Sequence, residues 1–312
     1  MEALAVDEKK SVFAHKDIAY EVLYPLLEAH RADIEQVARR TYRYGTTNRR
    51  QLDVYYPSST STGRAPVLFF VYGGGYAGGS RKMSPPHELV YANVGAFFAK
   101  HGLITVITDY RVLPDAKFPD PAADVRDALV WFASHAADVN AGSPVKVDSD
   151  SLFIMGHSVG ADIVATLFLL PDFLPPDLHA HVRGLILKGG AYHYQTKALT
   201  SPPETVLAYY GSEGSILRHQ PLTLLREASE DTIHALPEVL TYVSEHELAT
   251  IRESSVDFHA LLSERLGRPV ETRVMAGHNH ISPHIALGTG LGEEWAVEVA
   301  EWAKARIIRP SL

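Results

Sequence analysis

Apolar and polar positions divide the chain into short, continuous apolar runs separated by longer stretches with helical periodicity. The runs are rich in β-branched and aromatic residues, which is typical of strands buried on both faces of a mostly parallel sheet. They cover residues 66–72, 103–110, 151–156, 182–189, 238–244 and 271–276. Helical patterns lie between them, at about 86–100, 120–137, 158–170, 249–266 and 290–307. This alternation of strands and helices predicts an α/β fold with a doubly wound sheet.

Three segments depart from the alternation. Helical spacing over about 15–40 predicts one or two helices, and alternating residues on both sides of "TTNRR" predict a β-hairpin. The segment 192–235 contains Pro, Gly and aromatic residues without a strand pattern, so we expect an insertion over the C-terminal edge of the sheet. With the N-terminal segment 1–40 it would form a small cap above a pocket, within a single domain, 1–312.

The composition of the chain limits the kinds of partner that we expect it to bind. The net charge of −8 disfavours nucleic acid and anionic membrane surfaces, because phosphate binding requires clustered Lys and Arg. The absence of cysteine excludes disulfides, thiolate metal sites and a cysteine nucleophile. "MEALAVDEKKSVF" lacks the features of a secretory signal and no apolar run could span a bilayer, so we expect a cytoplasmic protein. An exposed edge strand or the last helix could support a homodimer.

The most informative stretch is "SLFIMGHSVGADIVATLFLL", in which a buried strand runs into Gly156-His157-Ser158-Val159-Gly160 and then a helix. This is G-x-S-x-G in the strand–turn–helix context that gives the motif its meaning. The sharp turn requires small residues two before and two after the serine, and it exposes the hydroxyl at a helix N-terminus. Ser158 is therefore a candidate nucleophile, and the alternative is a Gly-Ser turn that only caps a helix.

A second motif, "FFVYGGGYAGG", follows an earlier strand. Glycines allow the backbone to come close to a substrate, and backbone N–H groups can stabilise the oxyanion of a tetrahedral intermediate. The candidate donors are the amides of Gly74 and Gly75, with that of Val159 after the nucleophile, and Tyr76 is a candidate substrate-binding residue. A flexible glycine turn is the alternative. A phosphate loop fits poorly, because no G-x-x-x-x-G-K-[ST] is present.

With these motifs the sequence resembles the α/β-hydrolase superfamily, and within it the carboxylesterases related to hormone-sensitive lipase and to arylformamidase. "YGGGY" stands where that group has H-G-G-G and an aromatic residue, "GHSVGAD" matches its nucleophile turn, and "TDYRVLPDAKFPDPAADVRDALVWF" matches its D-Y-R…F-P…D block. The resemblance covers roughly residues 40–305. Tyr72 replaces the histidine of H-G-G-G, which puts loop rigidity and substrate range in question. The resemblance implies a structural ion-pair role for Asp109 and Arg111.

A serine hydrolase also needs an imidazole base and a carboxylate that orients it, and α/β-hydrolases supply them in the order Ser, acid, His. The family pattern laid on "SEHEL" places the acid at Glu247, with Glu245 as the alternative. In "AGHNHISPH" the same pattern places the base at His280, with His278 as the alternative. Zinc ligation by these histidines is the less favoured interpretation, since a complete serine constellation is already present.

These features predict a serine carboxylesterase that acts on small to medium acyl or aryl esters through an acyl-enzyme, without a cofactor or metal. An amidase of the arylformamidase type would use the same machinery. A non-enzyme that binds a small molecule is a third hypothesis, which retention of all three triad candidates disfavours. The expected pocket residues are Tyr72, Tyr76, Val159, Tyr209, Tyr210 and Leu217, and the alternative is that these positions belong to the core.

Overall fold

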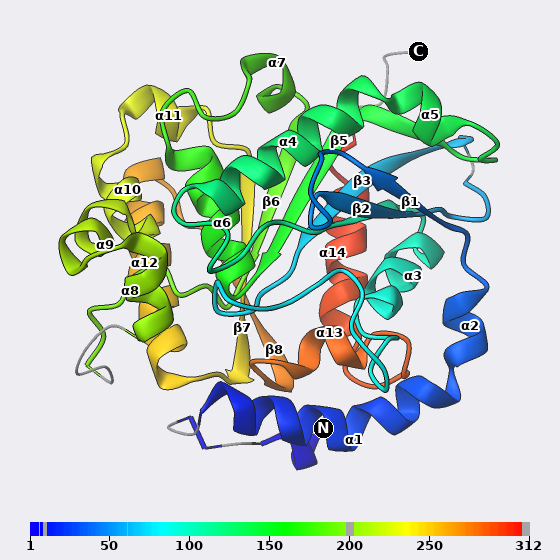
Figure 1. Ribbon diagram of the computed structural model, residues 1–312, viewed down its shortest axis with the longest axis horizontal. Helices are drawn as coiled ribbons and strands as arrows, with labels where there is room; N and C mark the ends of the chain where they lie inside the picture. Colours follow the sequence, from blue (N-terminus) through cyan, green and yellow to red (C-terminus); the bar gives the residue numbers. More distant parts are fainter. Residues whose placement is uncertain (6, 9–10, 61, 198–202, 308–312) are drawn as a thin grey trace.

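The centre of the molecule is an eight-stranded sheet in the order β1-β2-β4-β3-β5-β6-β7-β8 (Figure 1). The structure, a computed structural model, describes residues 1–5, 7–8, 11–60, 62–197 and 203–307, so 198–202 of the predicted insertion lie outside the described residues. The strands are β1 (Arg39–Arg43), β2 (Gln51–Tyr55), β3 (Arg64–Val71), β4 (Ile104–Thr108), β5 (Lys146–His157), β6 (Val182–Lys188), β7 (Glu238–His246) and β8 (Glu271–Asn279).

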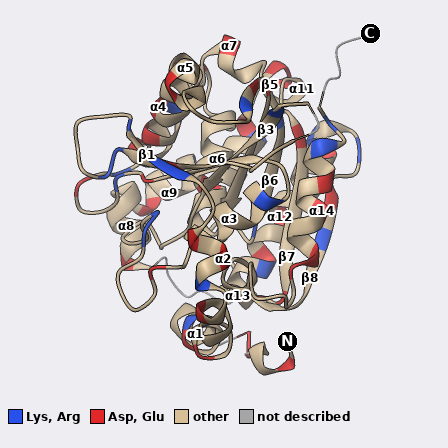
Figure 2. Cartoon of the chain, turned by 90° about the vertical axis from the view of Figure 1, so that its right-hand side faces the viewer, with Lys and Arg blue, Asp and Glu red and all other residues tan. Residues whose placement is uncertain are grey.

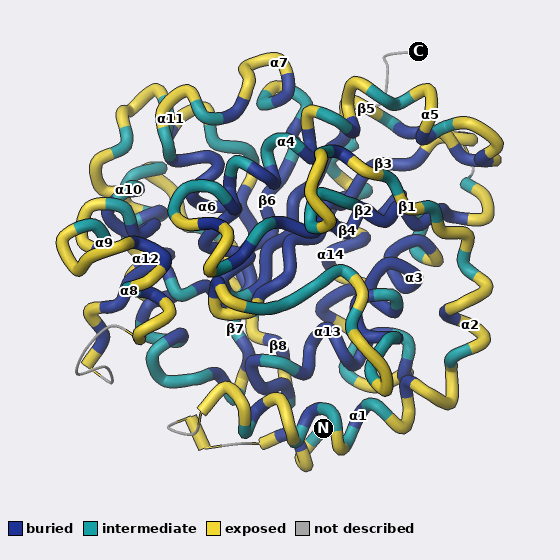
Figure 3. The backbone as a smooth tube through the Cα atoms, viewed as in Figure 1, coloured by how far each residue is buried: buried dark blue, intermediate teal, exposed yellow. Residues whose placement is uncertain are grey.

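The sheet is mostly parallel, as the apolar runs predict. Only β1 with β2 and β2 with β4 pair in antiparallel fashion, whereas the pairings from β4 through β8 are parallel. Every residue of β4 and all but the first of β3 are buried, because helices cover both faces of the sheet (Figure 3). The predicted hairpin is confirmed as β1 and β2, and its arginines Arg39, Arg40 and Arg43 form a basic stretch on the outer strand (Figure 2).

Helices fill the intervals between strands. They are α1 (Val12–Ala29), α2 (Arg31–Glu35), α3 (Ala92–Lys100), α4 (Asp120–Ser134), α5 (Ala136–Asn140), α6 (Val159–Leu169), α7 (Pro176–His179), α8 (Glu204–Tyr210), α9 (Glu213–His219), α10 (Pro221–Glu227), α11 (Glu230–His234), α12 (Ala249–Leu266), α13 (Ser282–Ala286) and α14 (Glu294–Lys304), after a short 3₁₀ turn η1 (Glu2–Leu4). Among the described helices, none combines the length and the apolar character needed to cross a bilayer.

The carboxyl ends of the parallel strands point to one edge of the sheet, and α1 runs across that edge (Figure 1). α1 packs there against α13, the helix that follows β8. In open α/β sheets this edge is where ligands bind. The N-terminal helix therefore lies beside the region in which the candidate site residues should meet.

One sequence prediction about a helix needs correction. The helix expected at 86–100 begins only at Ala92, because proline at 85 and 86 disfavours helical backbone and Tyr91 adopts a φ of 73°. The segment 192–235 carries α8 to α11 in its described part, each of them short. Caps divide it: Ser212 and Ser229 accept hydrogen bonds from first-turn amides, and α8 ends at Gly211 with a φ of 84°.

Candidate active site

Ser158 occupies a sharp turn between β5 and α6. Its backbone has φ 54° and ψ −130°, a strained conformation for a residue other than glycine. The turn is crowded: a Cβ on Gly156 would lie 2.5 Å from the carbonyl oxygen of Gly160, and a Cβ on Gly160 would lie 2.1 Å from that of Val71. Glycine is therefore required at both positions of G-x-S-x-G, and the serine hydroxyl is presented to the pocket.

A chain of hydrogen bonds joins three side chains from separate parts of the sequence. His280, directly after β8, has its Nε2 3.0 Å from Ser158 Oγ, and its Nδ1 lies 2.7 Å from Glu247 Oε1. The side chains of His280 and Glu247 are almost completely buried. The Leu248 amide also donates to Glu247 Oε1, at 3.0 Å. Gly189 leaves room for the pair, since a Cβ there would lie 2.9 Å from Glu247 Oε2.

The two alternative residues lie elsewhere. Glu245 accepts a hydrogen bond of 2.7 Å from the Gly277 amide at the surface. His278 Nδ1 lies 2.9 Å from Ser282 Oγ and its Nε2 donates to the Gly292 carbonyl, and burial lowers the pKa of His278 to about 4. Both ring nitrogens of His278 thus form hydrogen bonds within the C-terminal part of the chain, so neither is available to accept the proton of Ser158.

The glycine loop after β3 approaches the serine closely. A Cβ on Gly73 would lie 2.8 Å from Ser158 Cβ, so the backbone could not come as near with any other residue. Gly74 has a φ of 146° and its carbonyl accepts the Gly78 amide at 2.9 Å. In the described part of the chain, the amides of Gly74 and Gly75 donate no hydrogen bond within the protein.

Tyr72, the residue that stands in place of the family histidine, anchors the start of this loop. It is fully buried, its hydroxyl donates to Asp109 Oδ1 at 2.6 Å, and Arg49 Nη2 donates to that hydroxyl at 3.2 Å. Arg81 forms an ion pair with Asp109 and also donates its backbone amide, at 2.6 Å, from the far end of the loop. The loop is thus held at both ends by one carboxylate. The rigidity that the substitution put in question is supplied by a phenol–carboxylate contact.

Asp109 and Arg111 both form ion pairs, but not with each other. Arg111 makes a bidentate contact with the fully buried carboxylate of Asp124, at 2.8 and 2.9 Å, and Arg50 approaches the same carboxylate. This ion pair fixes the loop after β4 to α4. The structural role that the resemblance implies holds for both residues, with different partners.

The N-terminal segment holds the loop that carries His280, a feature that the sequence did not indicate. Asn279 Nδ2 donates to the carbonyls of Leu4 and His15, each at 3.2 Å, and the His280 amide donates to His15 Nδ1 at 3.4 Å. From the other side, His157 Nε2 donates to the His280 carbonyl at 2.8 Å. The imidazole is therefore oriented by contacts with both the beginning and the middle of the chain.

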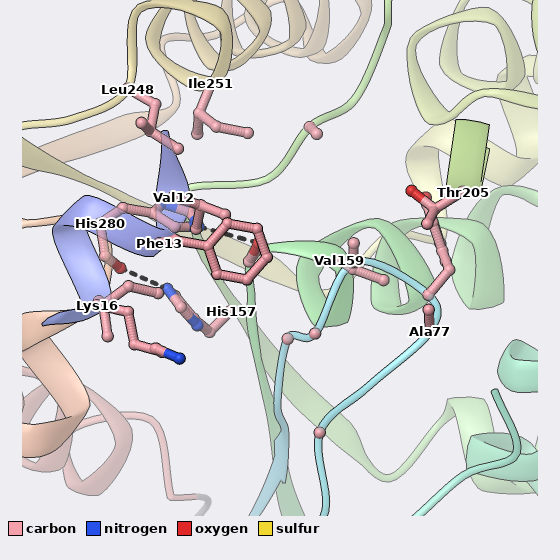
Figure 4. A pocket seen from close by; sticks show the side chains of 18 of the residues that line it. Val12, Phe13, Lys16, Ala77, His157, Val159, Thr205, Leu248, Ile251 and His280 are labelled. Carbon is pink, nitrogen blue, oxygen red and sulfur yellow. Dashed lines mark hydrogen bonds between the residues drawn. The ribbon is translucent and has the colours of Figure 1, made fainter. Parts of the chain in front are cut away.

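The serine and histidine open onto a pocket of about 670 Å³. Figure 4 shows Val12, Phe13 and Lys16 of α1 on one side of it, with Leu248 and Ile251 beside them and Thr205 opposite. Tyr76 and Val159 line this pocket as expected. The other expected residues do not line it: Tyr72, Tyr209 and Tyr210 pack behind Tyr76 or its loop, and Leu217 is exposed on α9.

Comparison with known proteins adds to this geometry. The family model described as BD-FAE matches residues 52–172, from β2 to the end of α6 and thus both glycine motifs. The solved structure of a thermostable esterase from Pseudomonas putida ECU1011 superposes with a TM-score of 0.65 at 19% identity, covering 97% of this chain and 92% of that chain. The chain has the α/β-hydrolase fold. The predicted fold class and the resemblance to this superfamily are confirmed.

Curated relatives of this chain match only in part. The probable carboxylic ester hydrolase LipM of Mycobacterium tuberculosis is 32% identical over 130 residues, which is 41% of this chain and 27% of that protein. The non-reducing polyketide synthase ascC of Acremonium egyptiacum is 32% identical over 127 residues, 40% of this chain and 6% of that protein. The chain therefore spans a minor part of the length of these curated relatives.

A buried carboxyl lies beside this pocket. Asp162, in the first turn of α6, is 1% exposed, and its Oδ2 accepts the hydroxyl of Tyr76 at 3.0 Å. The hydroxyl of Tyr194 also donates to Oδ2, at 3.4 Å. Burial raises the pKa of Asp162 from its usual 3.8 to about 8. The phenols around it stay uncharged, because burial raises the pKa of Tyr76, Tyr194 and Tyr210 as well.

This carboxyl predicts a pH-dependent term in stability. The folded state retains the Asp162 proton up to about pH 8, whereas the unfolded chain releases it near the usual value, so unfolding releases a proton between the two. The free energy of unfolding should fall by about 1.4 kcal/mol per pH unit as pH rises through this window. The Asp162→Asn side chain cannot titrate. The melting temperature of this variant, relative to that of wild type, should therefore rise between about pH 5 and pH 8. An equal difference at both ends of the window would contradict the prediction.

Proposed function

We propose that the protein is a serine hydrolase that cleaves carboxylic esters. The observation that carries this proposal is the continuous path from Ser158 Oγ through His280 to Glu247, with contacts of 3.0 and 2.7 Å. It opens onto a pocket beside glycine amides that have no other acceptor among the described residues. The esterase named among the solved structures and the ester hydrolase named among the relatives are consistent with this activity.

In the first half of the reaction, His280 Nε2 takes the proton from Ser158 as Oγ attacks the ester carbonyl carbon. Glu247 accepts the Nδ1–H bond, fixes the tautomer and stabilises the imidazolium. Amides of Gly74, Gly75 and Val159 would hold the oxyanion, and losing one such donor typically costs about 3 kcal/mol of barrier. When the tetrahedral intermediate collapses, the C–O bond to the alcohol breaks and His280 gives its proton to the leaving oxygen.

The second half returns the enzyme to its starting state. His280 removes a proton from water, and the hydroxide attacks the acyl-enzyme carbonyl. The intermediate then expels Ser158, which recovers its proton from His280 as the carboxylic acid departs. The three side chains and the backbone amides account for every proton in this sequence, so the proposed chemistry needs no metal or cofactor.

The substrate that we propose is an ester with a small to medium acyl or aryl group. Most of the pocket wall is apolar or aromatic, from Val12 and Phe13 of α1 to Leu248 and Ile251 at the start of α12. Such a wall stabilises an apolar group through burial of surface, and a small number of polar groups fixes its orientation. The carbonyl would be bound at the glycine amides.

The proposal is tested by a substrate panel with active-site labelling. We expect hydrolysis of 4-nitrophenyl acetate and butyrate, weaker hydrolysis of N-formylkynurenine, and covalent labelling by a fluorophosphonate. A strong preference for the formamide would make the protein an amidase of the arylformamidase type. A wild-type protein that neither turns over these substrates nor takes up the label would fit a binding protein and reject the proposed activity.

A further inference from the structure

The mechanism makes no use of Asp162, although this residue is rigidly connected to the nucleophile. It lies one helical turn after Ser158 in α6, and its amide donates to the Ser158 carbonyl at 3.4 Å. Its side chain points away from solvent into a group of tyrosines. A buried carboxyl that receives phenol hydroxyls must contribute either to folding alone or to the geometry of something that those phenols hold.

One of these phenols belongs to the candidate oxyanion loop. Tyr76 immediately follows Gly75 and has a φ of 63°, a left-handed conformation that costs a tyrosine about 1–2 kcal/mol. Its side chain compensates: the ring stacks on Tyr209 with centroids 3.9 Å apart, and the hydroxyl donates to Asp162 Oδ2 at 3.0 Å. Its carbonyl accepts the Leu113 amide at 2.9 Å. The end of the glycine run is thus fixed through the side chain of Tyr76.

We propose that Asp162 is a positioning residue: by holding Tyr76, it keeps the amides of Gly74 and Gly75 at a set distance from Ser158. The inference rests on the proposed hydrolase function. Three consecutive glycines have the largest conformational freedom of any such segment, so without side-chain anchors their amides would sample many orientations. Asp162 joins the loop to the helix that begins at the nucleophile, so that oxyanion donors and attacking oxygen move as one unit.

The link requires an acceptor oxygen and not a charge. The carboxyl is buried away from solvent, which favours the uncharged acid, and the Tyr76 hydroxyl donates to its oxygen. An asparagine at this position retains such an oxygen at almost the same place. A leucine retains the approximate volume but removes the carboxyl acceptor of the Tyr76 hydroxyl and leaves it the Tyr194 hydroxyl, 3.0 Å away. Losing a hydrogen bond is costly in a buried site. Asp162→Asn and Asp162→Leu therefore separate hydrogen bonding from filling of space.

The experiment measures kcat and KM for 4-nitrophenyl butyrate in the wild-type chain and four variants, together with their melting temperatures. We expect Asp162→Leu and Tyr76→Phe to lower kcat by about ten- to hundredfold, because a displaced oxyanion donor weakens binding of the transition state more than binding of the substrate. KM should change by less than about threefold. Asp162→Asn should keep kcat within about threefold of wild type.

Tyr192→Phe is the matched control, because it also removes one hydroxyl from a fully buried tyrosine. The ring of Tyr192 stacks on Phe258 of α12, and Tyr192 does not line the pocket. Its kcat should equal that of wild type. A loss of kcat in this control as large as in Tyr76→Phe would mean that buried tyrosines act on activity through stability alone, and this would overturn the inference.

Two other results would also overturn it: an unchanged kcat in Tyr76→Phe, or an Asp162→Asn variant as slow as Asp162→Leu. If Asp162→Leu fails to fold, Tyr76→Phe and Asp162→Asn still decide the question. Failure of the inference is distinct from failure of the proposed function. In the first case wild type hydrolyses the ester and takes up the fluorophosphonate, and in the second it does neither.

Discussion

Replacing Ser158 with alanine should lower kcat/KM for 4-nitrophenyl butyrate by about 10⁴- to 10⁶-fold. Without Oγ there is no acyl-enzyme, and the remaining rate would come from the oxyanion amides acting on water. The fold should persist, because the strained turn depends on Gly156 and Gly160, and among the described residues the hydroxyl forms a hydrogen bond with His280 alone. Steady-state kinetics and fluorophosphonate labelling measure the effect, and ester hydrolysis and covalent labelling should be lost together.

Ser134→Ala is the matched control for this prediction, because it makes the same serine-to-alanine change at another position. Ser134 ends α4, where its hydroxyl bonds to the Val130 carbonyl at 2.9 Å, and it does not line the pocket. Its kinetics should match those of wild type. A Ser158→Ala protein that keeps more than about a hundredth of wild-type activity, or that still takes up the label, would show that another nucleophile operates.

The second large effect is expected from Glu247→Gln, which should lower kcat by about 10³- to 10⁴-fold. The glutamine amide can donate to Nδ1 of His280, which places the imidazole proton on Nε2, the nitrogen that must accept the proton of Ser158. The variant also lacks the charge that stabilises the imidazolium. A kinetic comparison under identical conditions measures this effect, and the melting temperature should not fall by an amount that accounts for it.

Glu245→Gln provides the matched control, two residues away. Glu245 receives the Gly277 amide at an exposed position, so its neutralisation should change kcat by less than about threefold. The reverse pattern, with Glu245→Gln slow and Glu247→Gln active, would assign the role of the acid in the triad to Glu245. The same pair of variants therefore tests an assignment that the family pattern left open.

Much of the fold could be predicted because its strands are buried on both faces. A strand such as β4 needs apolar residues at successive positions, and this requirement leaves a visible run in the sequence. The residues at which helices begin were harder to predict. The start of α3 depends on the backbone conformation of Tyr91, whose positive φ no local sequence pattern specifies. The exposure of Leu217 was also missed, since the placement of short helices depends on tertiary contacts. The extent of the domain and a homodimer stay predictions.

The candidate site, too, could be predicted only in part from the sequence. Ser158 and the glycine loop carry local motifs, because crowding at these turns excludes side chains. Glu247 and His280 were placed with the help of the family pattern, and their roles stay predictions until the variants are measured. The contacts of Asn279 with Leu4 and His15 had no local signal, because they join positions more than two hundred and sixty residues apart. Such contacts become visible only in the folded molecule.

The clamp of the N-terminal segment on the loop of His280 has a consequence for biosynthesis. His15 is synthesised more than two hundred and sixty residues before His280, and the segment around Gly292, which secures the neighbouring His278, emerges later still. The nascent polypeptide can therefore bury much of its sheet while its serine remains unpaired and inert. Reactivity would arise only when the loop of His280 closes against the N-terminal segment that was made long before it.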